Sequence, residues 1–230
     1  MTQHHQIEVV FPESVKPFVK MQANDDFIIY RDPPYFPVVA ERVRAYNPAV
    51  ALELGAGVGR MSHYFFKKFG WLKTFFYLQD GDSGDEQYGG IRGSIEDEYY
   101  NSFQAATDFC QANGMTHFEL IHQLAKVTKP VDFVYSFAAI GFHWHINLYL
   151  DQLPPLLAEG AKLLFEIRAP IDAEEDAHEK KRIDFQEFFD DQVNYAQHHA
   201  AYTDVEIVDL KDYTGYRYKE RTHFLLMSKK

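Results

Sequence analysis

The sequence of 230 residues contains one cysteine and no long hydrophobic run. A single cysteine, Cys110, excludes an internal disulfide and a cysteine-based zinc cluster. The longest apolar candidate, residues 133–142, has half of the roughly 20 residues that a membrane helix needs. The N-terminus has neither a basic start nor an apolar core, so we expect no cleaved secretion signal. These absences predict a cytoplasmic protein with no membrane partner.

Positive charge is also scarce, with 23 Lys and Arg against 34 Asp and Glu, and a net charge of −11. Residues 80–98 carry seven acids and one arginine, and residues 171–191 carry nine acids and three bases. Because acidic surfaces repel phosphate backbones, we expect a small-molecule partner and no nucleic acid. Hydrophobic residues make up 46% of the chain, which is enough for the core of one globular domain and excludes a wholly disordered chain.

Short apolar runs alternate with helical patterns along the chain. Strands are predicted at residues 50–54, 73–78, 117–121, 131–136, 161–167, 205–210 and 222–227. Helices are predicted at residues 36–46, 59–69, 99–113, 146–157 and 183–200, the fourth interrupted by a Pro-Pro pair. Alternating strands and helices indicate a parallel sheet covered on both faces. We therefore predict an α/β fold, a Rossmann-like doubly wound sheet of seven strands, mostly parallel with an antiparallel last strand.

A glycine-rich run, Glu53-Leu54-Gly55-Ala56-Gly57-Val58-Gly59, follows the first predicted strand and precedes a helix. Small residues let the backbone approach a ligand closely, and a helix start offers free N–H groups. A dinucleotide fingerprint would require a glycine at position 60, where the chain has Arg60, so a nicotinamide oxidoreductase is disfavoured.

This run resembles the first motif of class I S-adenosylmethionine-dependent methyltransferases, and the predicted strand order resembles theirs over residues 38–228. The resemblance implies a transferase that binds S-adenosyl-L-methionine and releases S-adenosyl-L-homocysteine. Gly55, Ala56, Gly57 and Gly59 would pass beside the methionine part of the cofactor. Glu53 matches the acid that orders this loop or meets the amino group of the cofactor.

Further cofactor residues are implied at the ends of later strands. The family places an acid after the second strand to bind the ribose hydroxyls, and Asp80 stands there with Asp82 as a rival. A carboxylate accepts two such hydrogen bonds, although both acids would also suit a turn. His122 and Gln123 follow the third strand, where the family has a polar residue near adenine.

Three more residues are candidates for binding the cofactor, and one nearby motif is interpreted as a turn. Ser136 and Phe137 follow the fourth strand and correspond to the segment that lines the cofactor. Arg31 is a candidate for binding the cofactor's carboxylate, with an ordinary surface arginine as the alternative. The run D-P-P-Y at residues 32–35 has the letters of an N-methyltransferase signature but precedes the first strand by about 17 residues, so we interpret it as a turn.

The segment Gly-Phe-His-Trp-His at residues 141–145 follows the fourth strand, where this fold presents ligands. Methylating a hydroxyl requires a base, and the pKa of histidine suits that task. His143 and His145 are therefore the predicted catalytic residues. The alternatives are that they cap the next helix, hydrogen-bond within the core, or hold a divalent metal with a carboxylate.

The combined prediction is a methyltransferase that moves a methyl group from S-adenosyl-L-methionine to a small-molecule hydroxyl. Alternatives are a metal-assisted O-methyltransferase using acids from residues 80–98, an N-methyltransferase, and a non-catalytic cofactor-binding protein of the same fold. Residues 38–230 form the predicted methyltransferase domain, with residues 1–37 as an extension that caps the substrate. Residues 83–100 and 170–200 are predicted substrate-side insertions. The sequence does not define the oligomeric state, and a homodimer is one option.

Overall fold

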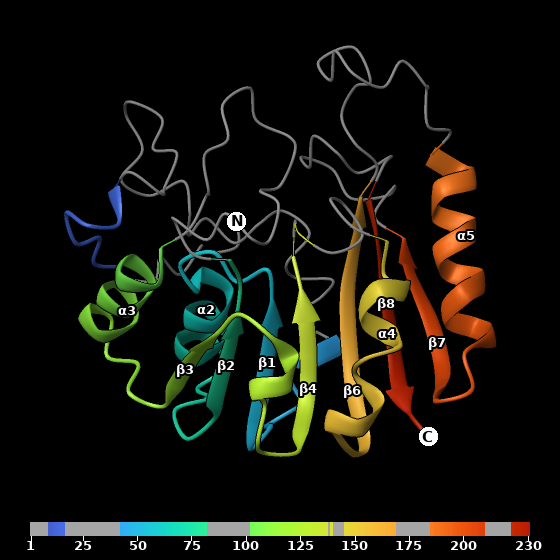
Figure 1. Ribbon diagram of the computed structural model, residues 1–230, viewed down its shortest axis with the longest axis horizontal. Helices are drawn as coiled ribbons and strands as arrows, with labels where there is room; N and C mark the ends of the chain where they lie inside the picture. The colour runs from blue at the N-terminus through green and yellow to red at the C-terminus, as the bar shows by residue number, and fades with distance from the viewer. Residues whose placement is uncertain are drawn as a thin grey trace, which may run out of the picture.

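The computed structural model describes residues 9–16, 42–81, 102–137, 139, 145–168, 185–209 and 222–230. They include a seven-stranded sheet with the order β3-β2-β1-β4-β6-β8-β7 (Figure 1). The strands are β1 (Val50–Leu54), β2 (Phe75–Gln79), β3 (Phe118–Ile121), β4 (Val131–Ser136), β6 (Leu157–Arg168), β7 (Tyr202–Asp209) and β8 (Thr222–Lys229). Strand β8 runs antiparallel to β6 and β7, whereas the pairs among β1, β2, β3, β4 and β6 are parallel. The predicted fold class is confirmed.

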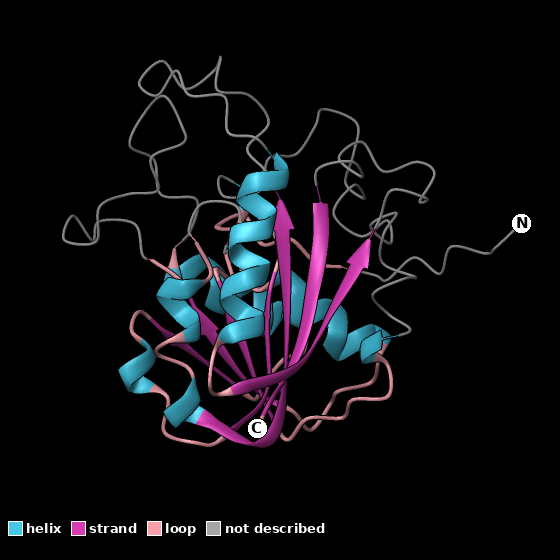
Figure 2. Ribbon diagram, turned by 90° about the vertical axis from the view of Figure 1, so that its right-hand side faces the viewer, coloured by secondary structure: helices cyan, strands magenta, loops and turns pink. Residues whose placement is uncertain are grey.

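Helices lie on both sides of the sheet (Figure 2). The helices are α2 (Arg60–Lys68), α3 (Phe103–Ala112), α4 (Asn147–Leu150) and α5 (Phe185–His198). Helices α2 and α3 pack into one hydrophobic cluster, and α4 and α5 pack into a second cluster on the opposite face. No helix in the described part of the chain is both long and apolar enough to cross a membrane.

Strand β1 shows why the sheet needs both helical layers. All five of its residues are buried. Ala51 belongs to the cluster with α2 and α3, whereas Leu52 and Leu54 belong to the cluster with α4 and α5. A central parallel strand covered on both faces is expected to be a continuous apolar run. Glu53 is the exception in this run, and its position matters for the site.

Two strands begin earlier than the sequence pattern predicts. Strand β6 begins at Leu157 and passes through Gly160, which has a φ of 67°, and the pairing register of β4 with β6 shifts there. Strand β7 begins at Tyr202 and contains Asp204 with a φ of 53°, beside another register shift. Such irregular positions interrupt the apolar alternation on which the prediction depended.

The helix predicted over residues 146–157 is shorter than expected. Helix α4 ends at Leu150, and a separate 3-10 turn covers Pro154–Leu156. Proline lacks the N–H that a continuing helix would need, so the Pro-Pro pair starts a new turn instead.

Residues 9–16 pack against α3. The N–H group of Val10 donates to Asn113 Oδ1, and Asn113 Nδ2 donates to the carbonyl of Val10, both at 2.8 Å. Val15 is fully buried in the cluster formed by α2 and α3. This part of the N-terminal segment therefore contributes to the core.

Aromatic rings fill the space between α2 and the sheet. Phe65 is fully buried, and its ring centroid lies 4.9 Å from that of Trp71 and 4.8 Å from that of Tyr135. The ring of Phe69 stacks on it at 5.4 Å. Phe65 therefore joins the helix, the following turn and β4 in one packed unit.

We predict that Phe65→Ala lowers the free energy of unfolding by about 3–5 kcal/mol, because it removes a ring with neighbours on several sides. Leu72→Ala is the matched control, since Leu72 is 58% exposed and its truncation should cost less than about 0.5 kcal/mol. Urea unfolding of the three proteins measures both effects. Equal losses for the two variants would show that Phe65 is not central to the packing.

Candidate functional site

The glycine run forms a tight loop between β1 and α2. Gly55, Gly57 and Gly59 have φ values of 69°, 56° and 82°, in the left-handed region that side chains disfavour. The N–H groups of Gly55 and Ala56 both donate to the carbonyl of Gln79, at 2.9 and 3.0 Å. The loop is therefore attached to the end of β2, and Gly59 directly precedes the first residue of α2.

The loop is crowded at Gly55 and open at Gly57. A Cβ on Gly55 would lie 2.3 Å from the Cβ of Ala139, so residue 55 must be glycine on steric grounds as well. A Cβ on Gly57 would meet no atom of the described residues within 4 Å. Among the described residues, nothing therefore blocks the backbone at Gly57.

Asp80, the residue after β2, connects that strand to the middle of the loop. Its Oδ2 accepts a hydrogen bond from the N–H of Gly57, and its Oδ1 accepts one from the N–H of Gly81 at 2.7 Å. Burial raises the pKa of Asp80, while these hydrogen bonds and the nearby His122 act in the opposite direction. Each oxygen keeps a further lone pair, so Asp80 holds the loop and can still accept bonds from a ligand.

Glu53 lies beneath the loop and is directed into the protein. The residue is 3% exposed, and its Oε2 accepts a hydrogen bond from the N–H of Ser62 at 3.1 Å and another from the Ser62 hydroxyl. The Ser62 hydroxyl also contacts the hydroxyl of Tyr135. Burial raises the pKa of Glu53 to about 8, and the two hydrogen bonds from Ser62 lower it. At neutral pH this carboxyl group is therefore mostly protonated.

His122 lies next to Asp80 at the end of β3. Gln79 Nε2 donates to the carbonyl of His122 at 3.1 Å, which ties the ends of β2 and β3 together. The imidazole stacks on the ring of Phe103, with centroids 4.2 Å apart and planes at 20°. Sequence reasoning missed Phe103, because only the tertiary structure brings the first residue of α3 to this place. Gln123 follows and is exposed.

Ser136 and Phe137 at the end of β4 have internal contacts. The Ser136 hydroxyl donates to the carbonyl of Leu54 at 2.9 Å, and so links the ends of β4 and β1. The ring of Phe137 lies 5.6 Å from that of Phe224. These two residues lie beside the loop, where the predicted cofactor-lining role remains a prediction.

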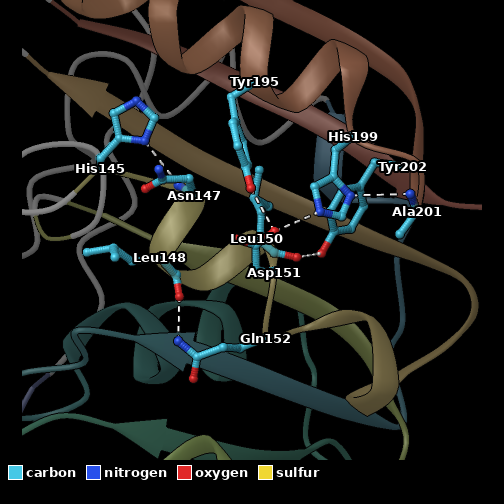
Figure 3. Close-up of polar contacts among 10 residues, drawn as sticks. All are labelled: His145, Asn147, Leu148, Leu150, Asp151, Gln152, Tyr195, His199, Ala201 and Tyr202. Atoms are coloured by element: carbon cyan, nitrogen blue, oxygen red, sulfur yellow. Dashed lines mark hydrogen bonds and ion pairs between the residues drawn. The ribbon is translucent and has the colours of Figure 1, made fainter.

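His145 precedes α4 and contacts residues of both α4 and α5; its contact with Asn147 of α4 is drawn in Figure 3. Its Nδ1 accepts the N–H of Asn147 at 3.2 Å, and its Nε2 lies 2.7 Å from Oδ2 of Asp191. Because Nδ1 accepts a hydrogen bond, Nε2 carries the proton and donates it to Asp191. Both ring nitrogens therefore have partners, which matches the alternative that this histidine caps the helix. Its catalytic role remains a prediction.

A second polar group joins α4 to α5 and β7 (Figure 3). Asp151 Oδ1 accepts from the hydroxyl of Tyr195 at 2.6 Å and lies 3.1 Å from Nε2 of His199. The hydroxyl of Tyr202 donates to the carbonyl of Leu150 at 2.8 Å. The sequence analysis assigned these residues no role. The spacing of Tyr195 and His199, four apart on a predicted helix, was the available signal for a shared contact.

Several predicted site residues lie outside the described residues. They are Arg31, Asp82, His143 and the D-P-P-Y run at residues 32–35, together with most of the predicted insertions and of the helix at residues 36–46. Within the described ranges, no three His, Cys, Asp or Glu side chains are grouped so that they could hold a metal ion.

Comparisons with known proteins support the fold. No family model and no curated protein matches the sequence. Many solved structures match, and the following three are among those that match with high probability. A "SAM dependent methyltransferase" from Aquifex aeolicus has 15% identity and a TM-score of 0.50, covering 86% of this chain and 89% of that one. A "putative rRNA-methylase" from Clostridium thermocellum has 12% identity and a TM-score of 0.52, covering 84% and 94%. A "putative caffeoyl-CoA O-methyltransferase" from Staphylococcus aureus has 13% identity and a TM-score of 0.52, covering 84% and 82%.

These likenesses establish that the chain has the fold of class I methyltransferases, as the glycine loop and strand order predicted. They also correct the expected partners. A small-molecule partner was expected and nucleic acid excluded because of the acidic charge, yet a structure with the same fold is described as an rRNA methylase. The prediction about partners was therefore wrong, because net charge does not separate the acceptors that this fold serves.

The raised pKa of Glu53 predicts a pH-dependent stability. Between about pH 4.5 and 8, only the folded state keeps the Glu53 proton, so each rise of one pH unit lowers the free energy of unfolding by up to about 1.4 kcal/mol. Glu53→Gln mimics the protonated acid and should remove this term, so its stability relative to the wild type should increase with pH. Urea unfolding at several pH values measures the difference.

The exposed Glu119 on β3 provides the control, since Glu119→Gln should leave the slope of stability against pH as it is in the wild type. Parallel curves for the wild type and Glu53→Gln would show that Glu53 is ionised in both the folded and the unfolded state.

Proposed function

We propose that this chain is an S-adenosylmethionine-dependent methyltransferase whose cofactor binds at the glycine loop. The observation that carries this proposal is the joint geometry of Gly57 and Asp80. No atom of the described residues lies within 4 Å of a Cβ placed on Gly57, and the adjoining acid at the end of β2 has lone pairs available. The class I methyltransferase fold, shared with the solved structures, is independent support.

The residues around the loop fit the parts of this cofactor. Asp80 is suited to accept hydrogen bonds from the two ribose hydroxyls. The stacked rings of His122 and Phe103 offer a flat surface near Asp80 for the adenine ring. The first turn of α2 directs N–H groups toward the loop and would favour the carboxylate of the methionine part. The cofactor supplies an activated methyl group, and this chain aligns the acceptor with it.

Methyl transfer to oxygen with a histidine base stays a prediction within this proposal. His143 lies outside the described residues, and both ring nitrogens of His145 have partners. If a base acts here, His145 must first release Asp191 or Asn147. The non-catalytic alternative differs in one observable respect: it binds the cofactor and transfers no methyl group.

Calorimetric titration with S-adenosylhomocysteine tests the cofactor site. We expect binding to the wild type and at least about tenfold weaker binding to Asp80→Ala, because hydrogen bonds to a charged acceptor contribute about 1.5–3 kcal/mol each. Gly57→Ala should weaken binding similarly by filling the open space. Gly70→Ala is its matched control, because Gly70 has a φ of 69° and no neighbouring atom within 4 Å.

Both glycine variants should lose about 1–2 kcal/mol of stability from the left-handed backbone, and only Gly57→Ala should lose affinity. A folded wild type that fails to bind would refute the proposed cofactor. Labelled methyl transfer from S-adenosylmethionine, offered separately to a small-molecule fraction and to RNA, then identifies the class of acceptor. Cofactor binding with no transfer to either would favour the non-catalytic alternative.

A further inference from the structure

A polar cluster is buried under the glycine loop, and the proposed cofactor contacts do not use it. The cluster consists of Glu53 on β1, Ser62 on α2 and Tyr135 on β4, which we call the Glu53 cluster. Glu53 is 3% exposed and the other two are fully buried. Ser62 donates to Glu53 through its N–H group and its hydroxyl, and the hydroxyls of Ser62 and Tyr135 are in contact.

The Glu53 cluster joins the two ends of the glycine loop on the side that faces the core. Glu53 lies two residues before Gly55, and Ser62 is the third residue of α2. Gly59 at the helix start has no side chain that caps the helix, so the Glu53 carboxyl supplies the acceptor for a first-turn N–H group. The chain from residue 53 to residue 62 is thus bridged at its two ends, while Asp80 holds its middle at Gly57.

The surroundings of the cluster favour an uncharged carboxyl group. The ring of Phe65 lies 4.8 Å from that of Tyr135, and Cys110 is buried nearby on α3. The charged and titratable groups that influence Glu53 are Asp80 at the end of β2 and Arg60 at the start of α2. The pKa of Tyr135 is itself raised by burial and by Glu53, so the phenol stays protonated. An ionised Glu53 would be a buried charge with no cation in direct contact among the described residues.

We propose that Ser62 and Tyr135 are positioning residues that hold the glycine loop in its ligand-binding shape through the hydrogen-bonded cluster that they form with the buried carboxyl group of Glu53. This inference rests on the proposed function, because it assigns the cluster to the same cofactor site. When Glu53 loses its proton, a negative charge is buried between β1 and α2, and the cost of that burial destabilises this arrangement of the loop. The loop then loses the shape in which the backbone at Gly57 meets the ligand. Cofactor affinity therefore falls as Glu53 ionises.

A direct electrostatic role makes the opposite prediction. If Glu53 met the positive charge of S-adenosylmethionine, its ionised form would bind the cofactor better. Affinity would then rise with pH, and Glu53→Gln would weaken S-adenosylmethionine more than the uncharged sulfide S-adenosylhomocysteine. The inward direction of the side chain, toward Ser62, argues for the positioning role.

The test is the dissociation constant of S-adenosylhomocysteine measured by calorimetry from about pH 6 to 9. In the wild type we expect affinity to fall about tenfold between pH 7 and 9, because about one molecule in ten then retains the Glu53 proton. Glu53→Gln keeps an uncharged acceptor at position 53. After correction for the ionisation of the ligand itself, its affinity should change less than about twofold between pH 7 and 9.

Ser62→Ala should shift the curve of affinity against pH, which a variant that only destabilised the fold would not do. The Ser62 hydroxyl lowers the pKa of Glu53, so its removal should move the midpoint of the affinity curve to higher pH. Tyr135→Phe should weaken binding at every pH and spare the fold, since it keeps the ring. Thr74→Val is the matched control, because it deletes a buried hydroxyl bonded to the carbonyl of Pro48, away from the loop, and should leave the midpoint unchanged.

The inference is overturned if the wild type and Glu53→Gln show the same dependence of affinity on pH, or if affinity rises with pH in the wild type alone. Failure of the proposed function looks different, because a folded wild type would then bind neither S-adenosylhomocysteine nor S-adenosylmethionine at any pH. Thermal unfolding of each variant at pH 7 confirms that the proteins compared are folded.

Discussion

Two buried or partly buried carboxyl groups hold the glycine loop, and the candidate site depends on them. Asp80 binds the N–H of Gly57, and Glu53 binds the N–H and hydroxyl of Ser62. The three left-handed glycines of the loop have no side chains, and although Ala56 and Val58 pack into the core, neighbouring groups must still satisfy the N–H groups of the loop. Burying these acids is costly, and the aromatic packing around Phe65 supplies the compact frame that keeps them in place.

Asp80 and Glu53 lie in different environments, and they therefore have different roles. Asp80 is partly exposed, accepts two backbone N–H groups and lies near His122. Glu53 is enclosed, and the charge of Asp80 raises its pKa further. Two neighbouring carboxyls are seldom both ionised when one is buried. Asp80 is therefore the partly exposed acid that a ligand can contact, and Glu53 is the enclosed acid that binds the first turn of α2 through Ser62.

The glycine loop and the position of Asp80 could be predicted from sequence because they are close along the chain. Strand β1, the glycines and Asp80 lie within 31 consecutive residues, 50–80, with clear apolar runs and turn chemistry. The contact of Glu53 with Ser62 spans nine residues but depends on how α2 leaves the loop, which no periodicity specifies. His145 and Asp191 are 46 residues apart, so their pairing appears only when α5 packs beside α4. Gly160 and Asp204 lie near the starts of β6 and β7, where their irregular backbone interrupts the alternation and hides the first residues of each strand.

Charge failed as a guide to the acceptor for a physical reason. The two acidic segments, residues 80–98 and 171–191, begin directly after β2 and three residues after the end of β6. Both strands are parallel to β1, so they end at the same edge of the sheet as the glycine loop (Figure 1). A net charge of −11 attracts a cationic ligand such as S-adenosylmethionine whatever the acceptor is. The acidic balance therefore bears on the proposed cofactor, and the acceptor has to be identified by transfer.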